Sequence, residues 1–350
     1  MEKKEWMVNL SLIIVSILVF LLISELALMI FFPHLKPTGH MKGIFFEYDS
    51  TLGWKGVPNA SGVFSTEAFT MNIALNLKGL RDNKDYSYNK PEKVTRIIVL
   101  GDSFTWGKGV NNSQIYTEFL ENKLDKVEVI NMGHSGYGTA QELLLLKHEG
   151  VKYSPDLIVL LFHASDLTDN VATSTGYYPR PVFAIDENNN IFLTNVPLPE
   201  ISLFNKIKAY LTYHSHLSYF VYERLQKSKS IQKIFAPIGL IQKRCVSDEK
   251  EIQYNWRLES ALLNEINDIS NNKLIIVAIS DEGNNLSKFC SENEIYFLNL
   301  QPEFEKQSLK GKQLIIPKDG HWNEDGHRLA AELIYKKLIE EELVAIGGDI

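Results

Sequence analysis

The chain has 350 residues, of which 45% are hydrophobic and 23% are charged, so it can bury a substantial core as one domain with appendages. A formal net charge of −7 without a long basic run argues against a nucleic-acid partner. The two cysteines, Cys245 and Cys290, have no partners at metal-ligand spacing, so we expect no zinc site. The pair can form a disulfide in an oxidising compartment or remain two unrelated thiols.

The first forty residues contain a long apolar segment. Eighteen uncharged residues run from Met7 to Ser24, and apolar sequence continues past Glu25 to Phe32. Such a run approaches the ~20 residues that cross a bilayer and exceeds the ~7–15 residues of a signal-peptide core. No convincing small-residue cleavage site follows it. We therefore predict an uncleaved transmembrane anchor over 1–33, with a buried helix of a soluble protein as the alternative.

A linker and a small β-rich preface are expected over residues 34–90. Prolines and glycines recur between residues 33 and 60, as is typical of a linker followed by turns. Short strand-like pieces follow between residues 63 and 85. We expect this preface to pack on the main domain instead of folding as an independent module.

The main domain is predicted over residues 91–345, where apolar β-branched runs alternate with helical stretches. This alternation favours a parallel sheet covered on both faces, which is a three-layer α/β/α sandwich. The last helix is expected over about 325–343, and Thr139-x-x-Glu142 has the pattern of a capping box that opens an earlier helix. The five predicted strands are residues 95–100, 127–131, 157–162, 273–279 and 295–299.

Residues 171–255 have a different character and are predicted to be an insertion. Loop and turn residues come first, and residues 201–235 then show a helical pattern rich in tyrosine. The tyrosines favour either a lid that contacts substrate or helices that pack against the edge of the sheet.

Ser103 follows the predicted strand 95–100 within Gly101-Asp102-Ser103. A serine at a strand-to-helix turn lies at the carboxyl edge of a sheet, beside free N–H groups of the helix start. This is where an α/β enzyme holds a nucleophile, although Asp-Ser before a helix is also typical of an N-cap.

The carboxyl end of the chain supplies a matching base and acid. Asp319 and His321 lie in Asp319-Gly320-His321-Trp322-Asn323. An imidazole that takes the serine proton, and a carboxylate that orients the imidazole, turn a serine into a nucleophile. His327 lies three residues after Glu324 and is the rival base, but it opens the last predicted helix and is expected to pack there.

With these residues the chain resembles the SGNH/GDSL hydrolase superfamily over roughly residues 90–340. Four blocks occur in the family's order: residues 101–103, 131–136, 162–166 and 319–323. The resemblance implies a flavodoxin-like fold with a mainly parallel five-stranded sheet. It also implies Ser103 as nucleophile, Asp319 and His321 as its partners, and the N–H groups of Ser103 and Gly136 as oxyanion donors.

Two features depart from the family pattern. Ser165 stands where the resemblance predicts an asparagine, whose side-chain amide would be the third oxyanion donor. Its hydroxyl can donate, and Asn170 in the following turn is a possible substitute amide. The Asp-x-His spacing is one residue shorter than the commonest form and is similar to that of relatives that act on polysaccharide acyl groups.

The resemblance implies a serine ester hydrolase or O-acyltransferase for acyl esters, foremost acetyl esters, of cell-envelope or extracellular glycans. No cofactor and no metal are expected. The expected partners are an acylated glycan and a membrane, with the amino terminus inside and a single-pass, extracytoplasmic catalytic domain. A lysophospholipase or thioesterase is the alternative enzyme, and a glycan-binding subunit that keeps the fold without catalysis is the alternative from another class.

Overall fold

A computed structural model describes residues 2–32, 44–227 and 249–344. Its contacts divide the chain into two compact units, one made of Met1–His40 with Ile201–Arg244 and the other of Met41–Glu200 with Cys245–Ile350. Cys245 lies outside the described residues, and Cys290 is buried, so their pairing stays a prediction.

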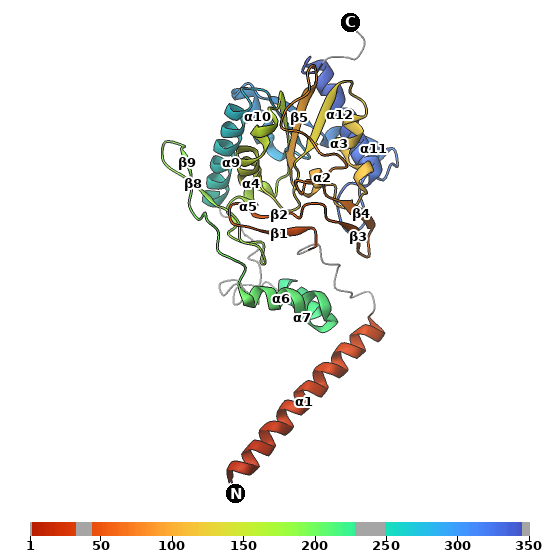
Figure 1. The fold of residues 1–350 in the computed structure, drawn as a ribbon, viewed down its shortest axis with the longest axis vertical. Helices are drawn as coiled ribbons and strands as arrows, with labels where there is room; N and C mark the ends of the chain where they lie inside the picture. Colours follow the sequence, from red (N-terminus) through yellow and green to blue (C-terminus); the bar gives the residue numbers. More distant parts are fainter. Residues whose placement is uncertain (1, 33–43, 228–248, 345–350) are drawn as a thin grey trace. The chain divides into compact units, whose positions relative to one another are not determined.

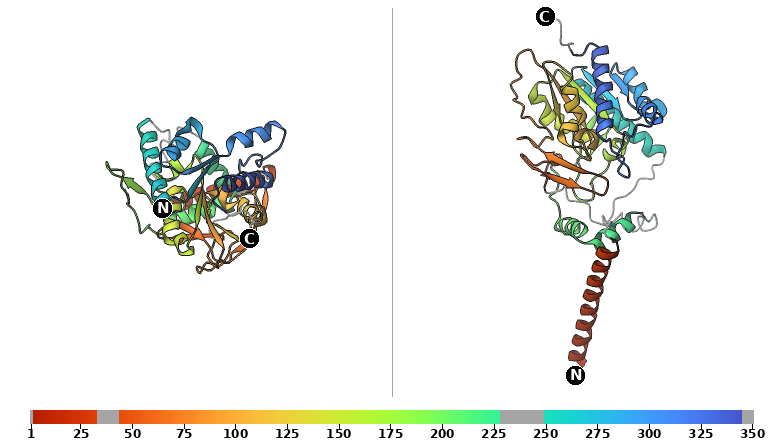
Figure 2. Two further views of the ribbon diagram at one scale, coloured as in Figure 1. Left: turned by 90° about the horizontal axis from the view of Figure 1, so that it is seen from above. Right: turned by 90° about the vertical axis from the view of Figure 1, so that its right-hand side faces the viewer.

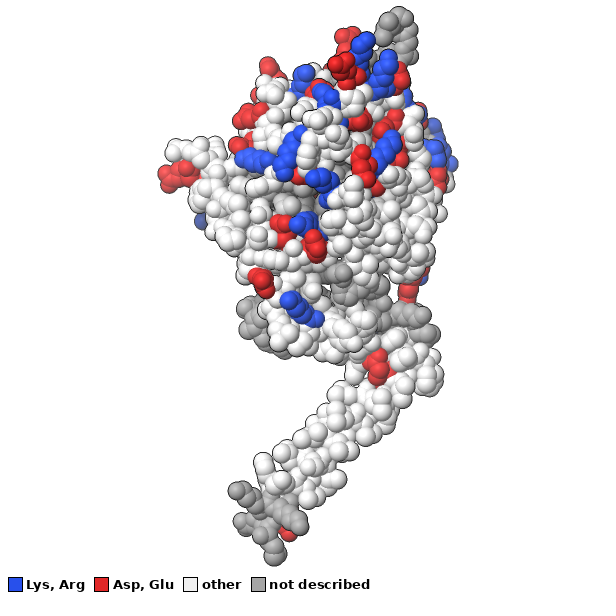
Figure 3. Space-filling model, viewed as in Figure 1, with Lys and Arg blue, Asp and Glu red and all other residues white. Residues whose placement is uncertain are grey.

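The described residues of the smaller unit form the helices α1 (Glu2–Phe31), α6 (Leu203–His214) and α7 (His216–Lys227). Within α1, residues Glu5–Phe31 are long and apolar enough to cross a membrane. Figure 3 shows that this helix is almost free of charged side chains. The structure thus confirms the predicted apolar helix as a possible single span. The tyrosine-rich helices α6 and α7 pack on each other, and α7 contacts α1. A role for them as a substrate lid stays a prediction.

The larger unit is built on a five-stranded sheet in the order β11–β10–β7–β5–β6, with every neighbouring pair parallel. The prediction of a parallel five-stranded sheet is confirmed, with ends that differ from the predicted ones by one residue at most. The strands are β5 (Thr95–Gly101), β6 (Val127–Asn131), β7 (Leu157–Phe162), β10 (Leu274–Ala278) and β11 (Tyr296–Asn299).

Helices cover both faces of the sheet (Figure 1; Figure 2). Alternate strand residues such as Ile97 and Val99 form one buried cluster with the helices α3 and α12, while Ile98 points toward Gly150 and the end of α4. The sheet is buried on both sides, which is why its strands read as continuous apolar runs. The helices of this unit are α2 (Ser103–Trp106), α3 (Tyr116–Glu121), α4 (Thr139–His148), α5 (Asp166–Asp169), α9 (Glu249–Ile269), α10 (Asn285–Glu292), α11 (Gln301–Leu309) and α12 (Glu324–Glu340).

Three short hairpins complete the larger unit. β1 (Phe46–Asp49) pairs with β2 (Gly53–Gly56), β3 (Ser61–Ser65) pairs with β4 (Thr70–Ala74), and β8 (Phe183–Ile185) pairs with β9 (Ile191–Leu193), all antiparallel. The second hairpin overlaps residues 63–85, where short strands are expected, but the first lies within residues 33–60, where a linker and turns are expected.

The predicted capping box at the start of α4 is wrong. Thr139 is already the first helical residue, and its hydroxyl donates to Glu259 Oε1 at 2.8 Å. Glu142 is fully buried, and its carboxylate has no hydrogen-bond partner among the residues that the structure describes. The cap comes instead from another helix end, because Asn170 Oδ1 accepts from the Ala140 N–H at 2.8 Å. Local sequence spacing could not reveal a cap supplied by a distant residue.

Candidate active site

The backbone around Ser103 is shaped by its two predecessors. Gly101 ends β5 with a φ of +150°, and a Cβ there would lie 2.2 Å from Thr105 Oγ1, so a side chain does not fit. Asp102 is the N-cap of α2, and its carboxylate accepts from the Phe104 N–H at 2.8 Å. The capping role therefore belongs to Asp102, which leaves the Ser103 hydroxyl available for chemistry.

The structure brings the three residues of the predicted triad into one chain of hydrogen bonds. Ser103 Oγ lies 2.7 Å from His321 Nε2, and His321 Nδ1 lies 2.5 Å from Asp319 Oδ1. A carboxylate at Nδ1 favours the proton on that nitrogen and leaves Nε2 as the acceptor for the serine proton. Burial and the charge of Lys108 lower the pKa of His321 to about 4, although Asp319 acts to raise it. The imidazole is therefore neutral at pH 7, as a general base must be.

Lys108 is a further member of this site. Its Nζ lies 3.0 Å from Asp319 Oδ2, the carboxylate oxygen that does not bind His321. Burial acts to raise the pKa of Asp319, but the hydrogen bond and charge of Lys108, with a smaller contribution from His321, hold it below its ordinary value. Sequence reasoning missed this lysine, because it lies 211 residues from Asp319 in the chain.

His327 lies apart from the nucleophile, in the interior of the domain. It is fully buried in α12, and its Nδ1 accepts from the Tyr116 N–H at 3.3 Å. Its ring stacks on Tyr116 with centroids 6.1 Å apart, and burial lowers its pKa to about 3. These contacts are those of a packed core histidine, as expected from its place in the last helix.

The loop after β6 is fastened to the nucleophile's helix. The Asn131 side chain donates to the Thr105 carbonyl at 2.9 Å and accepts from the Gly133 N–H at 2.9 Å. A Cβ on Gly133 would lie 2.6 Å from Thr105 Cβ, so the close approach requires glycine. Gly136, the predicted oxyanion donor, follows in the same loop with a φ of +83°.

Ser165 is bound to a histidine that sequence reasoning did not consider. Its Oγ lies 2.7 Å from His163 Nδ1, and its own N–H also points to that nitrogen at 3.4 Å. Because the N–H needs an acceptor, the pair fits a neutral His163 with its proton on Nε2, and the Ser165 hydroxyl then donates to Nδ1. His163 packs on Phe104, whose ring also packs on His321. In this structure the proton of the Ser165 hydroxyl is therefore used in a hydrogen bond to His163.

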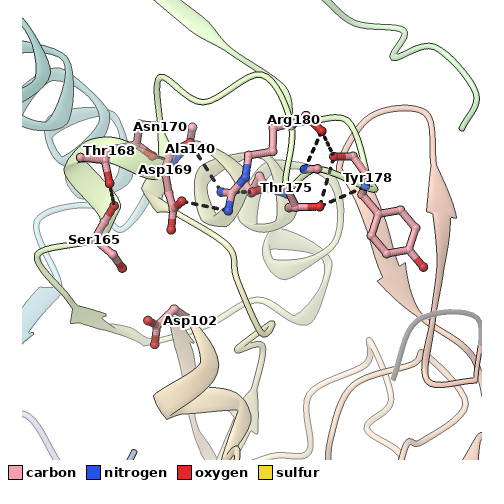
Figure 4. A network of polar contacts seen from close by, with 12 residues as sticks. Asp102, Ala140, Ser165, Thr168, Asp169, Asn170, Thr175, Tyr178 and Arg180 are labelled. Atoms are coloured by element: carbon pink, nitrogen blue, oxygen red, sulfur yellow. Dashed lines mark hydrogen bonds and ion pairs between the residues drawn. The ribbon is translucent and has the colours of Figure 1, made fainter. Parts of the chain in front are cut away.

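Asn170 is not placed to be a substitute oxyanion donor, and that expectation is corrected. Its side chain is buried; its amide NH2 donates to Glu259 Oε2 at 2.5 Å, and its carbonyl oxygen accepts from Ala140. Next to it, Asp169 forms an ion pair with Arg180 at 2.9 Å (Figure 4). These bonds tie α5 to α4 and α9 inside the domain.

Four buried carboxyl groups, one of them Asp102 beside the nucleophile, lie close enough for their charges to interact. Burial raises the pKa of Asp102 and of Glu259 to about 7, and it raises the pKa of Glu142 and of Asp166 well above the ordinary range. The charges of Asp102 and Glu259 raise the pKa of both Glu142 and Asp166 further, and the charge of Glu142 also raises the pKa of Asp166. Near neutral pH this cluster therefore holds protons. Among the described residues no group of His, Cys, Asp or Glu side chains has the arrangement of metal ligands.

Comparison with known proteins agrees with this geometry. The model of the family described as GDSL-like Lipase/Acylhydrolase matches residues 97–334. No curated protein matches the chain.

Solved structures similar to the chain include a lipolytic protein of the G-D-S-L family from Veillonella parvula (14% identity, TM-score 0.37, covering 71% of this chain and 97% of that one). A catalytic mutant of Axe2, an acetylxylan esterase from Geobacillus stearothermophilus, is 11% identical (TM-score 0.38, 71% and 96% covered). A two-domain esterase active on acetylated mannans is 12% identical (TM-score 0.36, 73% and 52% covered). Since the family model spans more than half of the sequence, the chain belongs to the GDSL-like lipase/acylhydrolase family and is a GDSL-type hydrolase of ester bonds.

Proposed function

We propose that the protein is a serine esterase or O-acyltransferase that acts on acetyl esters of cell-envelope or extracellular glycans. The observation that carries the proposal is the continuous contact from Ser103 through His321 to Asp319. Lone serine-histidine contacts are common on protein surfaces, but a serine at a strand-to-helix turn with an oriented, neutral imidazole has the features of an activated nucleophile.

In this mechanism Ser103 Oγ attacks the ester carbonyl while His321 Nε2 takes the hydroxyl proton. The bond from Oγ to the acyl carbon forms, and negative charge collects on the former carbonyl oxygen. The N–H groups of Ser103 and Gly136 are the proposed donors to this oxygen. His321 then gives its proton to the departing alkoxide as the ester C–O bond breaks, and Asp319 stabilises the imidazolium between the two transfers.

The second half of the reaction decides between hydrolysis and transfer. If a water molecule attacks the acyl-serine, the product is a free acid; if a sugar hydroxyl attacks, the acyl group moves to a new ester. In both cases His321 removes the proton from the attacking oxygen and returns it to Ser103 Oγ. The resolving nucleophile is thus the only chemical difference between the two activities.

We further propose that residues 1–33 stay attached as an anchor, followed by the preface 34–90 and the extracytoplasmic catalytic domain 91–345 with its insertion at 171–255. The contact that supports a retained anchor is the Glu25 carboxylate, which accepts the N–H groups of His216 at 2.7 Å and Leu217 at 2.9 Å. A leader that is removed would leave these two groups of α7 without their acceptor.

Two alternatives have specific support. An anchored site lies near lipids, which favours a lysophospholipase or thioesterase. The binding of Ser165 to His163 weakens the expected oxyanion donors, which favours a glycan-binding subunit without catalysis. Comparing turnover of acetyl and long-chain esters separates the proposed function from the first alternative. A glycan deacetylase prefers acetyl esters, whereas a lysophospholipase or thioesterase prefers long-chain ones.

The proposal is tested with the full chain in detergent, an aryl acetate and a fluorophosphonate probe that reacts with activated serines. We expect turnover and labelling in the wild type and in Ser308→Ala, which changes an exposed serine, and neither in Ser103→Ala. Equal labelling of Ser103→Ala, or no labelling of the wild type, rules out the mechanism. Mass spectrometry of an acetylated oligosaccharide incubated with an unacetylated acceptor then distinguishes transfer from hydrolysis.

A further inference from the structure

The only acidic residue between Trp6 and Phe32 caps another helix. Glu25 Oε2 accepts from Ser215 Oγ at 2.8 Å and from the Leu217 N–H at 2.9 Å, and Oε1 accepts from the His216 N–H at 2.7 Å. His216 Nδ1 is also 3.3 Å from Oε1. A carboxylate at a helix N-terminus satisfies N–H groups that have no partner within the helix and is favoured by the helix dipole. Glu25 therefore fixes the start of α7 to α1.

The position of Glu25 along α1 determines the depth in a bilayer at which α1 contacts α7. Eighteen uncharged residues from Met7 to Ser24 precede it. At ~1.5 Å per residue they span about 27 Å, close to the ~30 Å hydrocarbon thickness of a bilayer. If the segment from Met7 to Ser24 fills the hydrocarbon layer, Glu25 lies at the boundary between acyl chains and headgroups. The start of α7, and the α6–α7 hairpin attached to it, is then held at that boundary.

The helix α6 exposes an apolar stripe. Ser202 caps its start, Ala209 is its buried residue, and several large apolar side chains are exposed. At ~100° per residue these side chains fall within one sector of the helix, with Lys206 at one border of the sector and Lys208 at the other. An apolar face edged by lysines is the pattern of helices that lie in a membrane interface. The exposed apolar residues are Leu203, Phe204, Ile207, Tyr210 and Leu211.

We propose that the α6–α7 hairpin is a second membrane-binding element, which lies in the headgroup region of the bilayer that α1 crosses. The apolar stripe of α6 rests on the acyl chains, while Lys206 reaches phosphate groups of anionic lipids. The occupant of the exposed face is a lipid surface because Glu25 joins the hairpin to the span itself. This inference rests on the proposed anchor. It gives the insertion a role in binding the membrane, independent of ester chemistry.

The test uses the full chain in vesicles of phosphatidylcholine and phosphatidylglycerol. Single cysteines carry an environment-sensitive fluorophore in a Cys245→Ser, Cys290→Ala background whose aryl-acetate turnover reports folding. Ile207→Cys probes the stripe, Asn205→Cys on the opposite side of α6 is the matched control, and Leu18→Cys probes the middle of α1. Lipids with a nitroxide near the headgroup or deep in the acyl chain, and iodide in the water, are the quenchers.

We expect the Ile207→Cys probe to lose more fluorescence to the shallow nitroxide than to the deep one, and to lose little to iodide. The Asn205→Cys probe should be less quenched by lipid, and the Leu18→Cys probe most by the deep nitroxide. Glu25→Gln should reduce lipid quenching at Ile207→Cys and leave Leu18→Cys unchanged, since only the tie to α7 is weakened.

Three results overturn the proposal. Iodide quenching without nitroxide quenching at Ile207→Cys means that the stripe faces water. Protection from both quenchers means that protein covers the stripe. In either case, quenching of the Leu18→Cys probe by the deep nitroxide shows that α1 still crosses the bilayer and that only the hairpin proposal has failed. A Leu18→Cys probe that lipid does not quench refutes the anchor and, with it, this inference.

Discussion

Lys108 and His321 bind the two different oxygens of Asp319: Nζ of Lys108 lies 3.0 Å from Oδ2, and Nδ1 of His321 lies 2.5 Å from Oδ1. The backbone N–H of Lys108 also donates to the Ser103 carbonyl at 2.9 Å. One residue therefore connects the turn that carries the nucleophile to the acid that orients the base. A carboxylate held at both oxygens cannot rotate away from the imidazole without losing an ion pair.

Replacing Lys108 should misplace Asp319 and His321 relative to Ser103. We expect Lys108→Met to lower kcat by roughly 10–100-fold, the loss typical of a displaced catalytic group. Lys108→Arg should retain more activity, because it keeps the charge, although not the compact ammonium. Lys310→Met removes an exposed lysine and is the matched control. Equal activity of Lys108→Met and the control in an aryl-acetate assay would show that the ion pair does not position the acid.

The pH dependence of kcat/KM should report the lowered pKa of His321. The base works only when it is neutral, so activity falls as the pH drops through its pKa, which is about 4 in the folded protein. Activity should therefore persist well below pH 6.5, the ordinary titration point of histidine. Because the Lys108 charge helps to lower this pKa, Lys108→Met should shift the acid limb to higher pH. An acid limb near 6.5 in the wild type would contradict the expectation.

The sheet was predictable because its strands are buried on both faces. Residues 95–100 and 157–162 are nearly continuous apolar runs, and a run of this kind is recognisable without its neighbours. The start of α4 was not predictable. Thr139 and Glu142 have the spacing of a capping box, but Thr139 binds Glu259, 120 residues away, and this contact outweighs the local preference.

The site divides in the same way. Ser103 and His321 stand in short motifs whose chemistry can be read from their residue types. Lys108 stands in no motif, and its contact with Asp319 joins segments 211 residues apart. His163 stands in the block 162–166, but its residue type alone does not reveal that its ring binds the Ser165 hydroxyl. Asn170 has an amide group in the turn where an oxyanion donor was expected. That amide donates to the buried Glu259 carboxylate instead of facing the nucleophile. Residue type alone cannot separate an interior amide from one that faces a substrate.

Ser165 should contribute little as an oxyanion donor. Its hydroxyl donates to His163 Nδ1, so Ser165→Ala is expected to reduce kcat by less than ~10-fold, against the 10²–10³ typical of a working donor. Ser165→Asn supplies the amide that the family pattern carries at this position and should raise kcat. Thr168→Val, which removes a neighbouring hydroxyl, is the control. A loss of more than ~10²-fold in Ser165→Ala would place its hydroxyl on the oxyanion during turnover.

The buried carboxyl of Glu142 should make stability depend on pH. The pKa of Glu142 in the folded protein lies well above that of an unfolded glutamate. Its contribution to the free energy of unfolding is therefore fully present below the unfolded pKa and is lost as the pH rises toward the folded pKa. Glu142→Gln removes the ionisation. We expect the variant to gain stability over the wild type between pH 5 and pH 8, by about 1–3 kcal/mol at the upper end. Denaturant unfolding measures this difference, and the exposed Glu332→Gln should show none.

Arg81 should be required for the structure around the nucleophile. It is 1% exposed, and its guanidinium donates to the carbonyls of Trp106 at 3.0 Å, Gly107 at 2.5 Å and Val110 at 2.5 Å, at and beyond the C-terminal end of α2. It also lies 4.4 Å from the Trp106 ring. Burial lowers its pKa to about 9, which still leaves it charged at pH 7.

Removing this guanidinium would leave several buried carbonyls without a donor, at the end of the helix that carries Ser103. We expect Arg81→Met to reduce the free energy of unfolding by about 3–5 kcal/mol, the cost typical of breaking a buried charged network. Arg328→Met, which removes an exposed ion pair within α12, should cost less than ~1 kcal/mol. Denaturant unfolding of the two variants compares them directly. Similar losses would mean that other contacts of the preface hold the end of α2, and that Arg81 is dispensable there.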